Sequence, residues 1–438
     1  MKIVYRNIWV IPTVIFAILL VIGTQLHPLW ADEAETAFFA RTVNEKGLPY
    51  AFDGVNVTSQ AGGAALDKRL LNHINPWLQF YLVAGSFRLF GQSSFTARLP
   101  FLPFAVFSIP LIYYLALKLT GNKRTALMAC SIACTSVPFI LFSTQARYYS
   151  LTVFFGLSFI LAALHLPDKK LWPKILLVGS LAVMLHSNYF SSAILYAAVF
   201  PAFLWNTFSV TKKKDTTIKM GILYVFLGIA GFLLFLPWFL YADPLGSPEG
   251  LLISSFADFI QGLPLWFYIA TRYFNNDNTF PTVFVLLICA LFFTKKRLEE
   301  SFHGVAFLSF VILVYLGIIT FLSAYMVTSH TFFTEIRYNL VLIPLFFILN
   351  AILFSFLWSF NKAVCTIVLF LYLSTNIFTL NSLRSFPLEY LGEMLHPYKT
   401  SNEVVAEYLK KYAKDKDTAF VNSDRAHESL IFLLGKKI

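Results

Sequence analysis

The stretch "PLWADEAETAFFAR", residues 28–41, places three carboxylates directly after the first hydrophobic segment of the chain. A carboxylate at a membrane boundary is costly unless water solvates it or the protein uses it. Transfer of a group to a hydroxyl or an amine requires a base, and a carboxylate is a suitable one. Asp32 is the first candidate for this base, and Glu33 is the second. A plainer interpretation stays open: both are solvated loop acids, or Asp32 is the N-cap of a helix that begins here.

Basic residues follow in the same polar stretch, in "LDKRLLNHINPW". Lys68, Arg69 and His73 form this basic cluster, and cationic side chains of these types bind phosphate groups. Lys and Arg near a membrane more often extend their charged ends toward the headgroups. The cluster is therefore a candidate phosphate site with anchoring as its alternative.

Two tight outer turns, and the end of the outer loop 325–339, carry further candidates. Arg147 lies in "TQARYYSL", and Arg337 lies in "EIRYN"; both are candidates for binding a phosphate, although Arg337 has Glu335 two residues away as a partner. The other polar residues of these turns are weaker site candidates, because polar residues are ordinary in turns: Tyr148, Tyr149, Asn188 and Tyr189.

Apolar segments must position these residues. The chain has 438 residues, of which 58% are hydrophobic and 13% charged, and apolar runs of membrane-spanning length recur along it. We therefore predict an all-α, polytopic membrane bundle of about eleven transmembrane helices. Residues 76–91 are apolar but short, and we expect them to lie along the outer membrane surface. The expected spans are residues 8–26, 99–119, 125–142, 150–167, 174–187, 190–208, 218–240, 281–294, 304–324, 340–358 and 363–380.

The basic clusters determine the expected orientation. Consecutive clusters are separated by an even number of predicted spans, so all of them can face the cytoplasm, as the positive-inside rule requires. The longer loops then face outward, including the first, residues 27–98, so the chemistry is expected at the periplasmic or exterior face of the cytoplasmic (inner) membrane. The net charge of +11 thus reflects topology and excludes nucleic acid as the expected partner.

The apolar runs and the polar tail divide the chain into two predicted regions. Residues 1–380 form the membrane domain, and residues 381–438 form a small extracytoplasmic α/β tail. In the tail, Thr400 and Glu403 have the spacing of a capping box, "TAFVNS" is a candidate strand, and "ESLIFLLG" is a candidate helix.

No sequence motif identifies a nucleotide or a metal. The four cysteines lie inside apolar runs, where a small apolar role is the ordinary one. No glycine-rich phosphate loop and no Cys/His metal spacing is present, so an activated donor is expected to be carried by a lipid. Asp32 and Glu33 are able to share a divalent cation, although no spacing requires one.

The order of these motifs resembles the GT-C membrane glycosyltransferases over residues 1–360. The acidic "DE" is followed by "HINPWLQFYLVAGSFRLFG", "SSFTARLPF", "TQARYYSL", "LHSNYF", "LPWFLY" and "RYNLVLIPLF". The most similar groups are the protein O-mannosyltransferase-like family 39 and the lipid A aminoarabinose transferases of family 83. The chain departs from them at Ile74, where relatives carry a basic residue, at Tyr149, where many carry an acid, and at Ser187-Asn188, where many carry Thr-His.

The resemblance implies a bundle with interfacial helices in the first outer loop. It also implies inverting transfer of a sugar from a polyprenyl-phosphate donor to an acceptor, which is a lipid such as lipopolysaccharide, another envelope glycan or a protein. Asp32 matches the family's catalytic acid. A transporter or flippase for lipid-linked sugars is the alternative, since prolines interrupt several spans.

Overall fold

The structure of the chain is a computed structural model, which describes residues 7–58, 63, 65–168, 170–242, 260, 264, 299–328, 336–374, 386–414, 417 and 427–435. Within these residues the regular elements are helices. The first loop also contains isolated β-bridges between its own residues. The expected span 281–294 and the candidate strand "TAFVNS" lie outside the described residues. The predicted all-helical fold class is confirmed for the part of the chain that the structure describes.

The helices of the first half of the chain are α1 (Val10–Leu26), α2 (Ala31–Lys46), α3 (Leu78–Phe90), α4 (Ser94–Arg98), η3 (Leu99–Phe101), α5 (Leu102–Thr120), α6 (Lys123–Thr135), α7 (Val137–Ser143), α8 (Tyr149–His165), η4 (Leu166–Asp168) and α9 (Trp172–Thr211). Those of the second half are α10 (Lys214–Ala242), α13 (Glu299–Thr328), η5 (Ile336–Tyr338), η6 (Leu340–Leu342), α14 (Ile343–Phe360), α15 (Lys362–Ser374), α16 (Phe386–Leu395), α17 (Ser401–Tyr412) and α18 (His427–Leu434).

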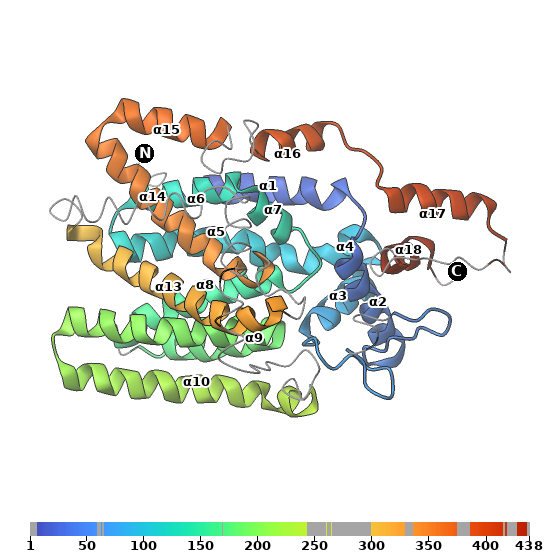
Figure 1. Cartoon of the computed structure of the whole chain (residues 1–438), viewed down its shortest axis with the longest axis horizontal. Coiled ribbons are helices and arrows are strands. Elements are labelled where there is room, and N and C mark those ends of the chain that lie inside the picture. The colour runs from blue at the N-terminus through green and yellow to red at the C-terminus, as the bar shows by residue number, and fades with distance from the viewer. Residues whose placement is uncertain are drawn as a thin grey trace.

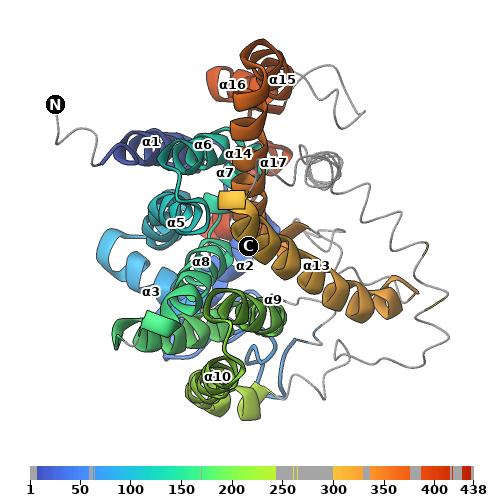
Figure 2. The ribbon, with the colours of Figure 1, turned by 90° about the vertical axis from the view of Figure 1, so that its left-hand side faces the viewer.

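The long apolar helices run side by side, as the side view and the end-on view both show (Figure 1 and Figure 2). Helices α2, α3 and α4 gather at one end of the bundle (Figure 1). Among the described residues, five helices are long and apolar enough to cross a membrane, and up to seven if two bent pairs each count as one span. A chain with these helices is a multi-pass membrane protein. Helix α3 has 13 residues and is not among the candidate spans, and the surface position of residues 76–91 stays a prediction.

The two bent pairs fall at informative places. Helices α1 and α2 meet at 84°, so the polar α2 turns away from the direction of the first span. Helices α6 and α7 meet at 71°, and the expected span 125–142 is therefore broken. The break follows from the sequence, because the Ser136 hydroxyl caps α7 and Pro138 at its second position has no N–H to continue α6.

Helix α9 reverses direction in the middle. Asn188 has φ −148° and ψ 90°, which are not helical values. Gly228 of α10 lies against Tyr196, and Gly231, one turn later, lies against Leu181. In one straight helix Leu181 and Tyr196 would stand about 22 Å apart. The chain therefore folds back at Asn188, which agrees with the turn predicted between residues 187 and 190.

The tail packs on the first outer segment. The capping box of Thr400 and Glu403 is present at the start of α17, as predicted. Helix α18 contacts both α17 and α2, and Phe432 of α18 packs against the cluster of buried side chains around Phe39 and Phe80. The tail thereby covers the helix that carries Asp32.

Candidate functional site

The first turn of α2 carries the acidic pair. Trp30 is the N-cap residue, and Asp32 and Glu33 both lie in the first turn. The interpretation of Asp32 as the N-cap is therefore wrong, because the helix begins one residue earlier, at Ala31. Acidic side chains are favourable in a first turn, since the exposed N–H groups make it electropositive.

Glu33 forms a buried ion pair with Arg98, the last residue of α4. The Arg98 Nη2 and Nε atoms donate to the two carboxylate oxygens at 2.6 and 2.8 Å, and the Glu33 side chain is fully buried. The remaining Arg98 donors reach the backbone oxygens of Thr24, His27 and Pro28 at 2.8, 2.8 and 3.1 Å. Arg98 thus fixes the corner between α1 and α2.

Glu33 also holds the turn that carries Arg147. The backbone N–H of Ala146 donates to Glu33 Oε1 at 2.6 Å. Both Glu33 oxygens are thereby committed to protein donors, and water does not reach them. This geometry argues against Glu33 as a base or as a metal ligand shared with Asp32, and favours a positioning role.

Asp32 lies between two arginines that are remote in the sequence. Its Oδ2 atom is 3.6 Å from Arg147 Nη2 and 3.2 Å from Arg337 Nη1. The Asp32 side chain is 13% exposed, compared with 4% for Arg147 and 25% for Arg337. The fold brings these three predicted residues together and leaves the carboxylate partly accessible.

Arg147 is held from several directions by α2. Its Nη1 atom donates to the Asp32 backbone oxygen and the Thr36 hydroxyl, both at 3.2 Å. The same atom lies 3.4 Å from Glu35 Oε2. The Arg147 guanidinium also lies over the Tyr148 ring, 5.6 Å from its centroid. Such a fully engaged, buried guanidinium is preorganised rather than free to move.

Burial raises the pKa of Glu35 to about 8, and the opposing attraction of Arg147 does not cancel this effect. Asp32 and Glu428 of α18 raise the pKa further, because they are acidic neighbours. Glu35 Oε1 has no hydrogen-bond partner among the described residues. The raised pKa favours the protonated, uncharged form of Glu35, which adds no negative charge beside Asp32.

Two of the weaker candidates line the same turn. The Tyr148 N–H donates to Gln79 Oε1 of α3 at 3.2 Å. The Tyr148 and Tyr149 rings meet edge to face at 4.8 Å, and Tyr149 is 1% exposed. The Tyr149 hydroxyl has no hydrogen-bond partner within the part of the chain that the structure describes. Both tyrosines therefore belong to the wall behind Arg147.

The basic cluster of the first loop contacts a different element. Arg69 pairs with Asp67 at 3.2 Å and its side chain is 65% exposed. His73 Nδ1 is 3.0 Å from the Ala242 backbone oxygen, and the Tyr241 hydroxyl is 3.5 Å from Asp67. Lys68 is exposed. These described contacts attach the cluster to the end of α10 and do not include Asp32.

The remaining candidates shape the reversal of α9. Asn188 Oδ1 accepts the Ser191 N–H at 3.1 Å, and Tyr189 packs on Phe235 and Trp238 of α10. These contacts are structural. Among the described residues, no group of three or more His, Cys, Asp and Glu side chains is placed to hold a metal ion.

The comparisons with known proteins point to one fold. Residues 75–241 match the family model of dolichyl-phosphate-mannose-protein mannosyltransferase. None of the curated proteins matches the chain. ArnT from Cupriavidus metallidurans in the apo state superimposes with a TM-score of 0.55 at 14% identity, covering 99% of this chain and 75% of ArnT. ArnT bound to undecaprenyl phosphate superimposes with a TM-score of 0.52 at 14% identity, covering 98% of this chain and 75% of ArnT.

A second solved structure has the same arrangement. The apo oligosaccharyltransferase of Archaeoglobus fulgidus gives a TM-score of 0.53 at 12% identity, covering 98% of this chain and 64% of that enzyme. The whole described bundle is shared, and the matched family segment extends from just before α3 to the end of α10. The chain therefore has the fold of the GT-C membrane glycosyltransferases, and the resemblance seen in its sequence is confirmed.

Proposed function

We propose that this chain is an inverting glycosyltransferase that moves a sugar from a polyprenyl-phosphate-linked donor to an envelope glycolipid, glycan or protein. The observation that carries the proposal is the position of Asp32: a partly exposed carboxylate beside two guanidinium groups at one end of the spans. The match to a lipid-phosphate mannosyltransferase model and the structure of ArnT with undecaprenyl phosphate support the class of donor.

The residues suit a single displacement. The acceptor oxygen attacks the anomeric carbon from the side opposite the phosphate, and Asp32 takes the acceptor proton. The bond from the anomeric carbon to the phosphate oxygen breaks, and the polyprenyl phosphate leaves with the electron pair. The anomeric centre is inverted, and no covalent enzyme intermediate forms. No metal ion is included in this step, because Glu33 is committed to Arg98 and Ala146.

The two arginines have different proposed tasks. Arg337 is more exposed, so it is the better candidate to contact the donor phosphate and stabilise charge on the leaving group. Arg147 is buried and bonded to α2, so it positions Asp32. Lys68, Arg69 and His73 remain candidates for phosphate binding at the end of α10.

The proposed reaction takes place at the outer face of the cytoplasmic membrane. The basic residues Lys212 and Lys213 lie between α9 and α10, at the opposite end of the bundle from α2 (Figure 1). The positive-inside rule assigns that end to the cytoplasm and Asp32 to the exterior.

The test compares envelope glycolipids and glycoproteins by mass spectrometry in cells with and without the protein. Wild-type chain is expected to add a sugar mass to one product class, and Asp32→Asn is expected to abolish the addition while the protein still inserts. Glu45→Gln is the matched control, because Glu45 is an exposed acid on the same helix. A fully active Asp32→Asn variant would remove Asp32 from the mechanism, and no added mass with wild type would count against glycosyl transfer.

A further inference from the structure

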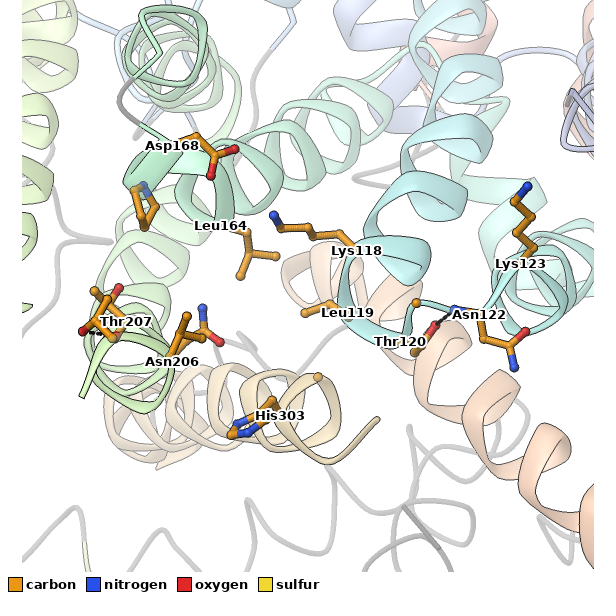
Figure 3. Close-up of a pocket in the computed structure, with 15 residues that line it drawn as sticks. Lys118, Leu119, Thr120, Asn122, Lys123, Leu164, Asp168, Asn206, Thr207 and His303 are labelled. Atoms are coloured by element: carbon orange, nitrogen blue, oxygen red, sulfur yellow. Dashed lines mark hydrogen bonds between the residues drawn. The ribbon is translucent and has the colours of Figure 1, made fainter. Parts of the chain in front are cut away.

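A pocket lies where α8 and η4 end, far along the chain of α8 from Arg147; Figure 3 shows the residues that line it. Helix α8 starts two residues after Arg147 and is continued by η4 to Asp168, which lines the pocket. The seventeen residues of α8 span about 25 Å, so at least the thickness of one membrane leaflet separates Arg147 from the pocket. This pocket is therefore distinct from the site around Asp32.

The pocket is a recess with a mixed polar and apolar lining, where five helical segments end or begin. Its volume is about 810 Å³, and its walls come from the end of α5, the start of α6, η4, the end of α9 and the start of α13. Gly304 of α13 closes it tightly against the Leu119 backbone, since a Cβ there would overlap the carbonyl group. The polar lining includes Lys118, Asn122, Asp168, Asn206, Thr207 and His303.

One cation and one anion face the hollow. Lys118 extends from α5 across the opening toward the side where Asp168 lies, whereas Lys123 points away (Figure 3). Both Lys118 and Asp168 are exposed. Neither forms an ion pair within the described residues. A ligand that carries both a phosphate and an ammonium group would complement them.

A buried hydroxyl in the wall is also unsatisfied. Thr207 is 2% exposed, and its hydroxyl has no hydrogen-bond partner among the described residues. Its oxygen is enclosed by protein atoms, so Thr207 belongs to the wall of the pocket and does not contact a ligand in it. The amide of Asn206, the preceding residue of α9, adds further donor and acceptor capacity to the pocket.

The exposed surface near the pocket mixes apolar side chains with lysines such as Lys170. Val210 lines the pocket and is 71% exposed, and Phe208 and Leu171 nearby in sequence are 47% and 67% exposed. Trp172 at the start of α9 is 42% exposed, as is typical of a side chain at headgroup depth. A ligand with acyl chains can therefore place its polar end in the pocket and its chains on this surface.

We propose that this pocket binds the phosphoethanolamine headgroup of a membrane phospholipid from the cytoplasmic leaflet. Lys118 holds the phosphate, Asp168 holds the ammonium group, and the Asn206 side-chain amide donates to a phosphate oxygen. The positive-inside rule explains lysines at this end of the bundle. It does not explain an acidic residue that faces the same hollow as Lys118.

The test measures lipid retention on the purified, delipidated full chain by native mass spectrometry. The protein is incubated with phosphatidylethanolamine, phosphatidylglycerol and phosphatidylcholine of identical acyl chains at equal mole fractions. Wild type is expected to retain phosphatidylethanolamine preferentially, because only this lipid offers both a phosphate and a primary ammonium group. Lys118→Gln and Asp168→Asn are each expected to reduce this retention about tenfold, the loss of one charge-assisted contact.

Matched controls lie on α10 at the same end of the bundle. Lys219→Gln and Asp215→Asn remove the same charges from exposed positions outside the pocket, and both are expected to retain the lipid as wild type does. Asn206→Ala provides a second pocket variant that keeps every charge, and it is expected to weaken retention as well.

Three outcomes would overturn the proposal. Equal retention by the pocket and control variants would show that the lipid binds elsewhere. A preference for phosphatidylglycerol would indicate a purely basic site, and full competition by soluble O-phosphoethanolamine would assign the pocket to a free metabolite. None of these measurements depends on glycosyl transfer.

Discussion

Asp32 is stabilised by two guanidinium groups that differ in what else they contact. Arg147 is bonded to the backbone and side chains of α2, whereas Arg337 is 25% exposed beside the carboxylate. Removal of a buried arginine leaves the carboxylate it pairs with uncompensated in the protein interior, which costs stability. Removal of a partly exposed arginine mainly weakens the binding of the ligand that this arginine contacts.

We expect Arg337→Gln to lower the transfer rate about a hundredfold or more, the range for loss of one charge-stabilising donor. Its thermal unfolding midpoint should change little. Arg147→Gln should lower both the rate and the midpoint, since Asp32 loses a buried charged partner and α2 loses the hydrogen bonds that Arg147 donates. Equal loss of stability in the two variants, measured by thermal unfolding in detergent, would contradict this division.

Glu35 predicts a pH dependence of stability. Its pKa is about 8 in the folded chain against an ordinary value of 4.5, so the folded state binds a proton that the unfolded state has released. The stabilisation is present below pH 4.5 and is lost as the pH rises toward and through 8. Arg147, Asp32 and Glu428 are the charged groups that act on it.

Comparison of wild type with Glu35→Gln tests this. As the pH rises from 5 to 8.5, the thermal unfolding midpoint of the wild type should fall relative to that of Glu35→Gln, because glutamine does not titrate. Parallel midpoints across this range would show that Glu35 is ionised in the folded chain. Glu45→Gln, which changes an exposed acid of α2, should follow the wild type.

The sequence predicted which residues lie at the site better than it predicted what each of them contacts. Asp32, Arg147 and Arg337 follow from polar residues at the ends of apolar runs, and the fold brings them together. The role of Arg98 was missed, because nothing in "SSFTARLPF" shows that it reaches back to Glu33 over 65 residues. Such long-range pairing is invisible to local spacing, and so is the attachment of His73 to α10.

At the scale of elements, α18 is the unexpected component. It was predicted as a helix of a separate tail, but it packs on α2, and its Glu428 is 4% exposed and raises the pKa of Glu35. Sequence periodicity predicts that such a helix exists, but it does not identify the surface that the helix covers.

We expect Leu430→Lys to lower the thermal midpoint and the transfer rate together. Leu430 is 7% exposed, and a lysine there would place a charge in the contact of α18 with its neighbours. The cost of such a substitution is about 2–5 kcal/mol, counting the lost leucine packing alone. Val404→Lys is the control, because Val404 is 53% exposed on α17. A normal rate in the Leu430→Lys variant would show that α18 does not support the site.

Apolar runs predicted the helices well and their interruptions less well. The turn at Asn188 was expected. Pro138 was counted among the prolines that interrupt spans, but residues 125–142 were still predicted as one span, which the break between α6 and α7 contradicts. A hydropathy window averages over a single proline, so it detects the length of an apolar run and not its continuity.

At the scale of the whole molecule, the two ends of the bundle should differ in accessibility. A single cysteine at Gln92, an exposed position between α3 and α4, should react with a membrane-impermeant maleimide applied to intact cells. A cysteine at Lys213 between α9 and α10 should react only after the membrane is opened. The three described native cysteines are buried and should contribute little background. The reverse pattern would place Asp32 in the cytoplasm and exclude the proposed donor geometry.

The Arg98–Glu33 ion pair also sets the order in which the site can assemble during synthesis. Glu33 emerges from the ribosome 65 residues before Arg98 and 113 residues before Ala146, the two groups that later satisfy its oxygens. Until then the acid must remain hydrated at the membrane surface, because an unpaired carboxylate is not tolerated in lipid. The corner between α1 and α2 can therefore close only after Arg98 has been synthesised, and the partners of Glu33 are complete only when Ala146 follows α7.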